Sequence, residues 1–123
     1  KKFSLKIDQI KKELEEFFKN AKIENKKIVC YGAAAKGNTL LNYCKIPNEV
    51  ILYIVDRSIY KQGLFLPGTH FIIKKPEDIK ETKPDYLLIL PWNLKDEIIE
   101  QMEFIRDWEG KFVIPIPEVQ IIS

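Results

Sequence analysis

Short apolar runs alternate with helical patterns along this chain, and that alternation most constrains its fold. The runs are residues 28–31, 50–55, 71–73, 86–90 and 112–114. Continuous apolar runs of this length are typical of strands buried on both faces of a parallel sheet. Gly32, Asp56 and Pro91 follow three of the runs directly, so each run has a defined end.

Amphipathic segments lie between the runs. Residues 5–21, 35–45 and 93–109 carry apolar side chains at helical spacing, and Gly110 follows the last of them. The tail is interrupted by Pro115 and Pro117, so it can form at most an edge strand. This order predicts an α/β domain: a Rossmann-like, three-layer fold of about five mainly parallel strands, with an extra N-terminal helix.

The length of 123 residues favours one domain. We expect a linker helix over residues 1–26 and a Rossmann-like domain over residues 27–123. The first residue is Lys1 rather than Met, which suggests a piece of a longer protein.

Composition excludes several classes of partner. The net charge is +2, and Lys and Glu are interspersed, so no basic stripe predicts nucleic-acid binding. No apolar run approaches the length of a membrane span. Cys30 and Cys44 form no CxxC or metal-type cluster, which favours a reducing compartment and a cytoplasmic location.

The strongest chemical signal is the turn between the first strand and the helix that follows it. Its sequence, Gly32 to Gly37, matches the dinucleotide pattern G-x-G-x-x-G with Ala34 at the middle glycine. Gly32 would make the tight turn, the small residues Ala33 and Ala34 would let the backbone approach a diphosphate, and Gly37 would let the helix pack closely. The helix N-terminus would then face an anion. Packing alone is the alternative reason for small residues here.

Polar and aromatic residues follow the carboxyl ends of several strands, where open α/β sheets bind ligands. The predicted ligand-binding residues beyond the glycine turn are Lys36, Asn38, Asp56, Ser58, Lys61, Gln62 and Trp92. Asp56 stands where the pattern expects an acid for a ribose hydroxyl. The two lysines would neutralise phosphate charge, and Trp92 would stack on a ring. The side-chain amides of Asn38 and Gln62 and the hydroxyl of Ser58 would form hydrogen bonds with the sugar or the base. The alternatives are solvated lysines and a tryptophan that serves packing.

Catalytic machinery is missing from the pattern. His70 is the only histidine and has no placed partner, so it is a weak catalytic candidate. No Ser/His/Asp set, Cys/His pair or metal-ligand spacing is present. Asn38 stands where a mononucleotide-binding loop needs its lysine. The sequence therefore predicts a binding site whose chemistry belongs to another domain.

Four segments, residues 31–42, 55–63, 66–70 and 83–93, resemble the C-terminal domain of the S-adenosylmethionine-dependent nucleotide-sugar C-methyltransferases. The resemblance extends from about residue 5 to about residue 119. It implies a zinc-binding N-terminal region and a middle domain that binds S-adenosylmethionine and carries the catalytic base, both outside this chain. It also implies that a Rossmann-like C-terminal domain helps to hold a nucleotide-diphosphate sugar.

The family's motifs map onto this sequence residue by residue. The matching positions are Gly32, Ala34, Lys36, Gly37 and Asn38 in the phosphate loop, Asp56, Ser58, Lys61, Gln62 and Gly63 in the second motif, Pro67, Gly68 and His70 in the third, and Pro91 and Trp92 in the fourth. Ile59 departs from the pattern, where a proline is expected. We therefore expect the substrate-binding domain of a nucleotide-sugar methyltransferase, inactive in isolation and joined in cis to the donor-binding domain. The alternatives are a stand-alone NAD-binding module and a structural domain that binds nothing.

Overall fold

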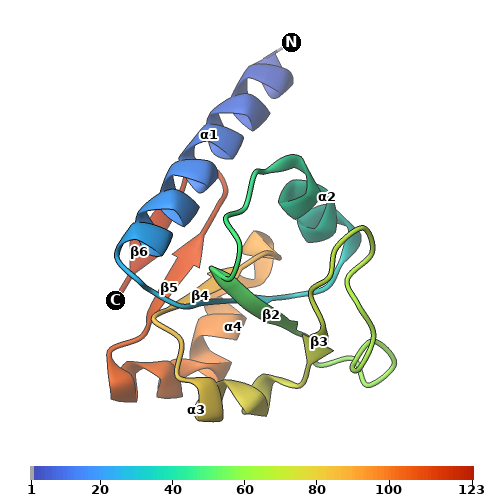
Figure 1. The fold of residues 1–123 in the computed structure, drawn as a ribbon, viewed down its shortest axis with the longest axis vertical. Helices are drawn as coiled ribbons and strands as arrows, with labels where there is room; N and C mark the ends of the chain where they lie inside the picture. The colour runs from blue at the N-terminus through green and yellow to red at the C-terminus, as the bar shows by residue number, and fades with distance from the viewer. Residues whose placement is uncertain (1) are drawn as a thin grey trace.

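One six-stranded sheet forms the centre of the molecule (Figure 1). The computed structural model describes residues 2–123, with side chains from residue 7 onward. The elements are, in chain order, α1 (Lys2–Ile23), β1 (Ile28–Tyr31), α2 (Ala35–Tyr43), β2 (Ile51–Val55), β3 (Ile73–Lys74), a 3₁₀ turn (Pro76–Asp78), α3 (Ile79–Thr82), β4 (Tyr86–Ile89), a 3₁₀ turn (Trp92–Leu94), α4 (Lys95–Gln101), a 3₁₀ segment (Glu103–Trp108), β5 (Lys111–Ile114) and β6 (Gln120–Ile122).

The strand order is β3-β2-β1-β4-β5-β6. All neighbouring pairs are parallel except β5 and β6, which are antiparallel. From β1 the chain builds outward through β2 to β3, and then crosses back to place β4 on the other side of β1. The gap between β1 and β4 is therefore the topological switch point of the sheet. This topology confirms the predicted Rossmann-like α/β class, with β6 as the edge strand.

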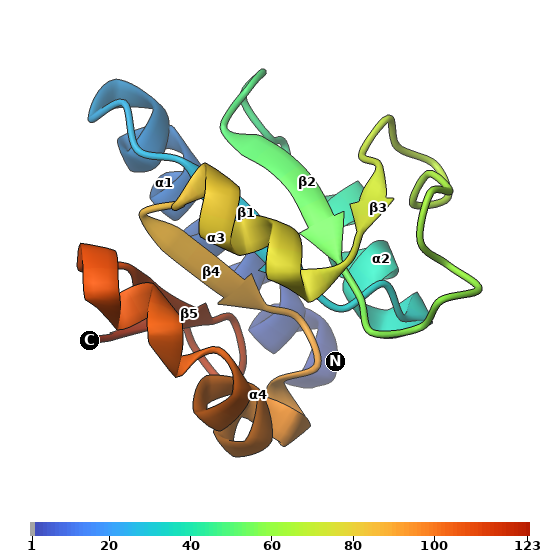
Figure 2. The same ribbon diagram turned by 90° about the horizontal axis from the view of Figure 1, so that it is seen from below.

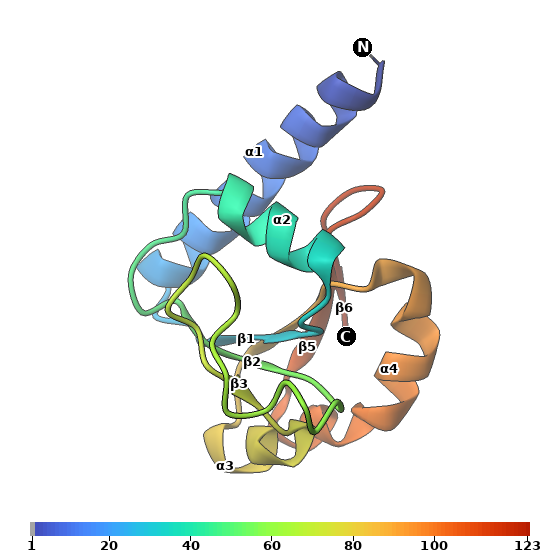
Figure 3. The same cartoon turned by 90° about the vertical axis from the view of Figure 1, so that its right-hand side faces the viewer.

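Helices cover both faces of the sheet, so the fold has three layers (Figure 3). α1 and α2 lie on one face, while α3 and α4 lie on the other (Figure 2). Successive β1 side chains alternate between the two cores: Ile28 and Cys30 pack with the first, and Val29 and Tyr31 with the second. This two-sided burial explains why the strand sequence is continuously apolar.

α1 is longer than the predicted 5–21 segment and packs directly on the sheet. It contributes to the first core Ile10, Leu14, Phe17, Phe18 and Ala21. These positions recur every three or four residues, which places them on one helix face. Among residues 2–123, no helix is both long and apolar enough to cross a membrane.

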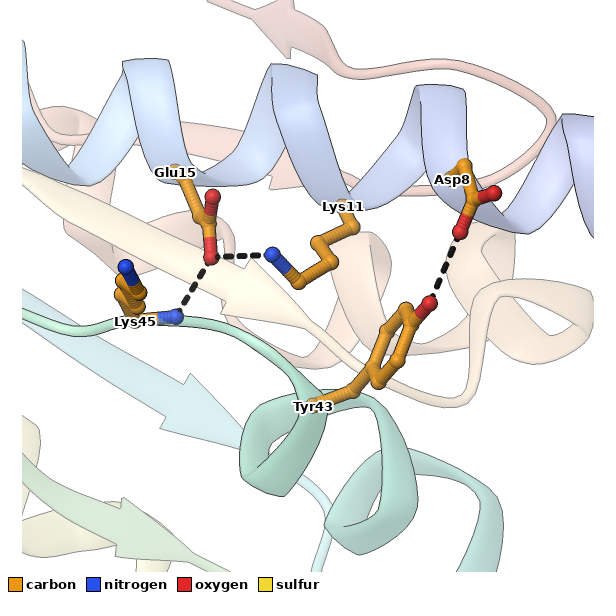
Figure 4. A network of polar contacts seen from close by, with 5 residues as sticks. All are labelled: Asp8, Lys11, Glu15, Tyr43 and Lys45. Atoms are coloured by element: carbon orange, nitrogen blue, oxygen red, sulfur yellow. Dashed lines mark hydrogen bonds and ion pairs between the residues drawn. The ribbon is translucent and has the colours of Figure 1, made fainter.

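A polar network also joins α1 to α2 and the residues after it (Figure 4). The Tyr43 hydroxyl donates to Asp8 Oδ1 at 2.7 Å. The Lys45 backbone N–H donates to Glu15 Oε2 at 2.7 Å, and Lys11 Nζ lies 2.9 Å from the same oxygen. The Lys45 N–H first, and Lys11 second, lower the pKa of Glu15. The carboxylate is therefore the form that ties the two segments together.

Two predicted elements differ from the structure. The third strand lies at Ile73–Lys74 rather than 71–73, because residues preceding it fold back: Leu66 N–H donates to Phe71 O at 2.8 Å. The single helix expected over 93–109 is interrupted, because the backbone at Met102 (φ −106°, ψ 19°) leaves the α-helical region.

Candidate functional site

Gly32 makes the tight turn at the end of β1, as predicted. Its φ is +104°, which favours glycine. A Cβ atom here would lie 2.6 Å from Cδ of Pro91, which follows β4. The Gly32 N–H donates to the Val55 carbonyl at 2.8 Å. The turn is thus fixed against both neighbouring strands at the switch point.

Gly37 lets α2 approach the sheet closely, also as predicted. It is buried in the first turns of α2, and an added Cβ would lie 2.7 Å from Cβ of Leu90. Such a distance is too short for any side chain. The absence of a Cβ at Gly37 therefore sets the position of the whole helix.

The N-terminus of α2 faces the carboxyl edge of the sheet. Its N-cap residue, Ala34, makes no side-chain hydrogen bond to the helix. The first helical N–H groups have no acceptor within the helix and carry a partial positive charge. Lys36 lies in this first turn and is exposed. The combination of amide donors and one ammonium group suits an anionic ligand.

A cleft of about 640 Å³ opens beside this helix end. Its lining comes from α1, from α2 and from the loops after β4 and β5, namely Ile7, Ile10, Lys36, Thr39, Leu40, Tyr43, Trp92 and Ile116. Because β1, β4 and β5 are parallel, the cleft lies outside their carboxyl ends. This is where open α/β sheets bind ligands, and the volume suits a small molecule.

The cleft brings together two of the predicted site residues, Lys36 and Trp92, and Lys36 is the charged residue of the lining. Thr39 and Tyr43 were not predicted, although they follow Lys36 at helical spacing and share its face. The α1 residues were not predicted either, because nothing local in the sequence shows that α1 borders the site.

The predicted residues after β2 form a separate polar group that does not line the cleft. Asp56 Oδ2 accepts the Ala33 N–H at 2.8 Å, and Oδ1 accepts the Ser58 N–H at 2.8 Å. The Gln62 side-chain amide donates to the Asp56 carbonyl at 2.8 Å. Lys61 Nζ donates to the Ala33 carbonyl at 3.3 Å. In this structure the side chains of Asp56 and Lys61 hold the β2 loop against the β1 turn, and the Gln62 side chain stabilises the loop itself.

Asn38 and His70 also lie away from the cleft lining. Asn38 Oδ1 accepts from Asn42 Nδ2 at 2.8 Å, and the same amide lies 3.2 Å from the Pro67 carbonyl. These bonds tie α2 to the β2–β3 connection. His70 is exposed, and its ring centroid lies 4.9 Å from that of Phe71.

A smaller cavity of about 330 Å³ lies on the opposite side of the sheet, among Tyr31, Arg57, Pro76, Glu77, Lys80, Gln101, Met102 and Phe104. No predicted site residue lines it. The Tyr31 hydroxyl donates to Gln101 Oε1 at 3.1 Å. Burial is the main cause that raises the pKa of Tyr31.

The two thiols are held in the protonated form. Burial raises the pKa of Cys30 above its ordinary range and that of Cys44 to about 11. Where side chains are described, no group of three or more His, Cys, Asp or Glu residues is placed to hold a metal ion. The cleft offers amide donors at the start of α2, one ammonium group and an aromatic ring, all of which can bind a ligand.

Comparisons with known proteins agree with this architecture. The family model for the C-methyltransferase C-terminal domain matches residues 1–117. C-methyltransferase NovU of Streptomyces niveus is 32% identical over 123 residues, which are 100% of this chain and 29% of NovU. The solved structure of UDP-D-quinovosamine 4-dehydrogenase from Vibrio fischeri has a similar fold, with a TM-score of 0.53 and 19% identity over 80% of this chain and 93% of that one. The chain therefore belongs to the C-methyltransferase C-terminal domain family.

Proposed function

We propose that this chain is the substrate-binding C-terminal domain of an S-adenosylmethionine-dependent methyltransferase acting on a nucleotide-linked deoxysugar. The observation that carries the proposal is the cleft at the switch point, which joins Lys36, the N-terminus of α2 and Trp92 in a chain of this family. Family membership supports the methyl-transfer part of the proposal, and the cleft supports the nucleotide-binding part.

The cleft matches the parts of a nucleotide-diphosphate sugar. The diphosphate would lie at the first turn of α2, where backbone N–H groups and the Lys36 ammonium favour negative charge. A flat ring would stack on the Trp92 indole, because aromatic faces hold bases without requiring a particular hydrogen-bond pattern. The apolar wall of Leu40 and Ile116 would cover the rest of the ligand.

The reaction itself would be carried out elsewhere in the full-length protein. The chain spans 29% of the length of NovU, so a protein of that size has room for further domains. We assign the methyl donor S-adenosylmethionine, the zinc ion and the catalytic base to those domains. The described side chains of this domain include no group of three or more His, Cys, Asp or Glu residues that could hold the zinc ion.

The rival function, NAD binding, needs Asp56 to accept hydrogen bonds from a ribose. In this structure each Asp56 oxygen already accepts one backbone N–H, from Ala33 and from Ser58. Asp56 thus braces the loop, while each of its oxygens keeps a further acceptor site. We favour the nucleotide-sugar function over the dinucleotide one because the chain belongs to the C-methyltransferase C-terminal domain family.

Thermal unfolding of the domain tests the proposal. We would add dTDP, a dTDP-sugar, NAD and S-adenosylmethionine in turn, because a ligand at a hundred times its Kd stabilises by about 2.7 kcal/mol. We expect the Tm to rise when dTDP or a dTDP-sugar is added, and to stay unchanged when NAD is added. Lys36→Met should weaken binding roughly tenfold, or about 1.4 kcal/mol, whereas Lys80→Met in the other cavity should not.

A rise in Tm with NAD alone would contradict the proposal in favour of a redox module. No response to any nucleotide, from the domain or from the full-length protein, would contradict nucleotide binding altogether.

A further inference from the structure

Four large apolar side chains stand exposed in one short segment between β2 and β3, which we name the 59–65 segment. The exposed fractions are 73% for Ile59, 87% for Tyr60, 58% for Leu64 and 62% for Phe65. Single exposed apolar residues are ordinary, but groups of them mark interaction surfaces. The segment projects from the β3 side of the molecule, far from β6 (Figure 1).

The exposure does not come from an irregular backbone. The Gly63 N–H donates to the Ile73 carbonyl at 2.7 Å, and the Ile73 N–H donates to the Leu64 carbonyl at 2.8 Å. Phe65 forms an antiparallel bridge with Ile72. The Lys61 N–H closes a turn on the Ser58 carbonyl at 3.1 Å. These backbone hydrogen bonds fix the segment in a conformation that leaves its apolar side chains exposed to water. This exposure costs hydrophobic free energy unless a partner covers the side chains.

The position of the segment indicates what covers it. It starts at the carboxyl end of β2 and is tied to the β1 turn through Lys61, whose Nζ lies 3.3 Å from the Ala33 carbonyl. The candidate cleft opens at the same edge of the sheet. A methyl group is transferred only when the donor reaches the bound substrate. A domain carrying the donor must therefore close over this edge, beside the 59–65 segment.

Length and charge agree with that occupant. The chain accounts for 29% of NovU, so most of such a protein lies outside it. Residues 57–65 contain Arg57 and Lys61 and no acidic residue. The complementary surface is therefore apolar at its centre and acidic at its rim.

We propose that the 59–65 segment is the docking surface for the methyl-donor-binding domain of the same full-length protein. This inference rests on the proposed function for the existence of that domain. Ile23 supplies a control position: it is 72% exposed but lies just before β1, at the opposite edge of the sheet.

Hydroxyl-radical footprinting tests the surface without requiring substrate or turnover. We expect Tyr60 and Phe65 to be oxidised at least fivefold more slowly in the full-length protein than in the 123-residue domain, and Ile23 to react alike in both. Equal oxidation of Tyr60 in both proteins would overturn the proposal. A different result would also overturn the proposal: Tyr60 and Phe65 could become more protected in the isolated domain as its concentration rises, and the domain could have a dimeric mass. The segment would then be covered by a second copy of this chain.

Variants of the full-length protein give the second test. In wild-type full-length protein we also expect the exposed Leu64 side chain to be protected from oxidation. The double change Tyr60→Ser and Phe65→Ser should lower the methyl-transfer rate at least tenfold and remove the protection of Leu64, while Ile23→Ser should do neither. Both side chains are exposed, so the variant domain should unfold at the wild-type Tm. If the footprint is present but no nucleotide sugar is methylated, docking stands and the proposed substrate falls. Unchanged turnover together with undiminished protection of Leu64 in the double variant would overturn the docking surface.

Discussion

Two glycines determine how closely the segments at the candidate site approach one another. Gly32 holds a backbone conformation that L side chains rarely adopt and lies against Pro91. Gly37 lies against Leu90. The first contact joins the β1 turn to the residues after β4, and the second joins α2 to them. Together they fix the two sides of the switch point.

The contact at Gly32 can be separated from the effect of its φ angle. Gly63 also has a positive φ, +89°, but an added Cβ there would meet nothing within 4 Å. We expect Gly32→Ala to lower the free energy of unfolding by about 1–3 kcal/mol more than Gly63→Ala does, since overpacking adds to strain. Urea unfolding of the two variants measures the difference. Equal losses would contradict the close contact with Pro91.

Cys44 predicts a loss of stability in alkali. Burial raises its pKa from 9.0 to about 11, so the unfolded chain releases this proton first as the pH rises. Its contribution is complete below about pH 9 and is lost progressively toward pH 11. We expect the free energy of unfolding to fall over this range, and to fall less in Cys44→Ala. A flat profile in the wild-type protein would contradict the burial of the thiol.

Sequence reasoning located the glycine turn and two cleft residues, Lys36 and Trp92, because a motif and the carboxyl-edge rule point to them. It grouped Asp56 and Lys61 with the same site because all follow parallel strands. In the structure their hydrogen bonds hold one loop against the other. Such bonds depend on loop geometry, which residue spacing does not encode.

At the scale of elements, α1 is part of the domain core on one face of the sheet. Its apolar side chains pack with β1 and α2, and its charged side chains bond to the segment after α2. It also forms one wall of the candidate cleft. The helix therefore contributes both to stability and to the shape of the site.

Truncation within α1 measures this contribution. Phe18 is fully buried, whereas Ile23, at the end of the same helix, is 72% exposed. We expect Phe18→Ala to lower the free energy of unfolding by about 3–5 kcal/mol. Ile23→Ala should change it by less than about 0.5 kcal/mol. Denaturant unfolding decides, and a loss below 1 kcal/mol for Phe18→Ala would show that α1 packs only loosely.

The central strands were predicted well because they are buried on both faces, and their continuous apolar runs record that burial. The segment 93–109 was predicted less well. Its apolar spacing is helical, but Met102 interrupts it and the last part, Glu103–Trp108, is a 3₁₀ segment. The Trp108 indole donates to the Pro84 carbonyl at 2.9 Å. This tertiary contact lies outside what local periodicity can predict.

At the scale of the whole molecule, the two faces of the sheet differ in what they offer. The α1–α2 face ends in the cleft with Lys36 and Trp92, and the other face carries the smaller cavity beside Tyr31. The two tryptophans are divided in the same way, because Trp92 lines the cleft and Trp108 packs with the second core. Each tryptophan thus reports on one side of the sheet.

The most direct test of the account follows the two indole N–H resonances by NMR while a nucleoside-diphosphate sugar is added to the domain. We expect the Trp92 signal to shift until the site is saturated and the Trp108 signal to stay in place. Lys36→Met should move the midpoint of the Trp92 titration to a roughly tenfold higher concentration. A Trp92 signal that does not move at saturating nucleotide sugar, or a shift of Trp108 alone, would contradict binding in this cleft.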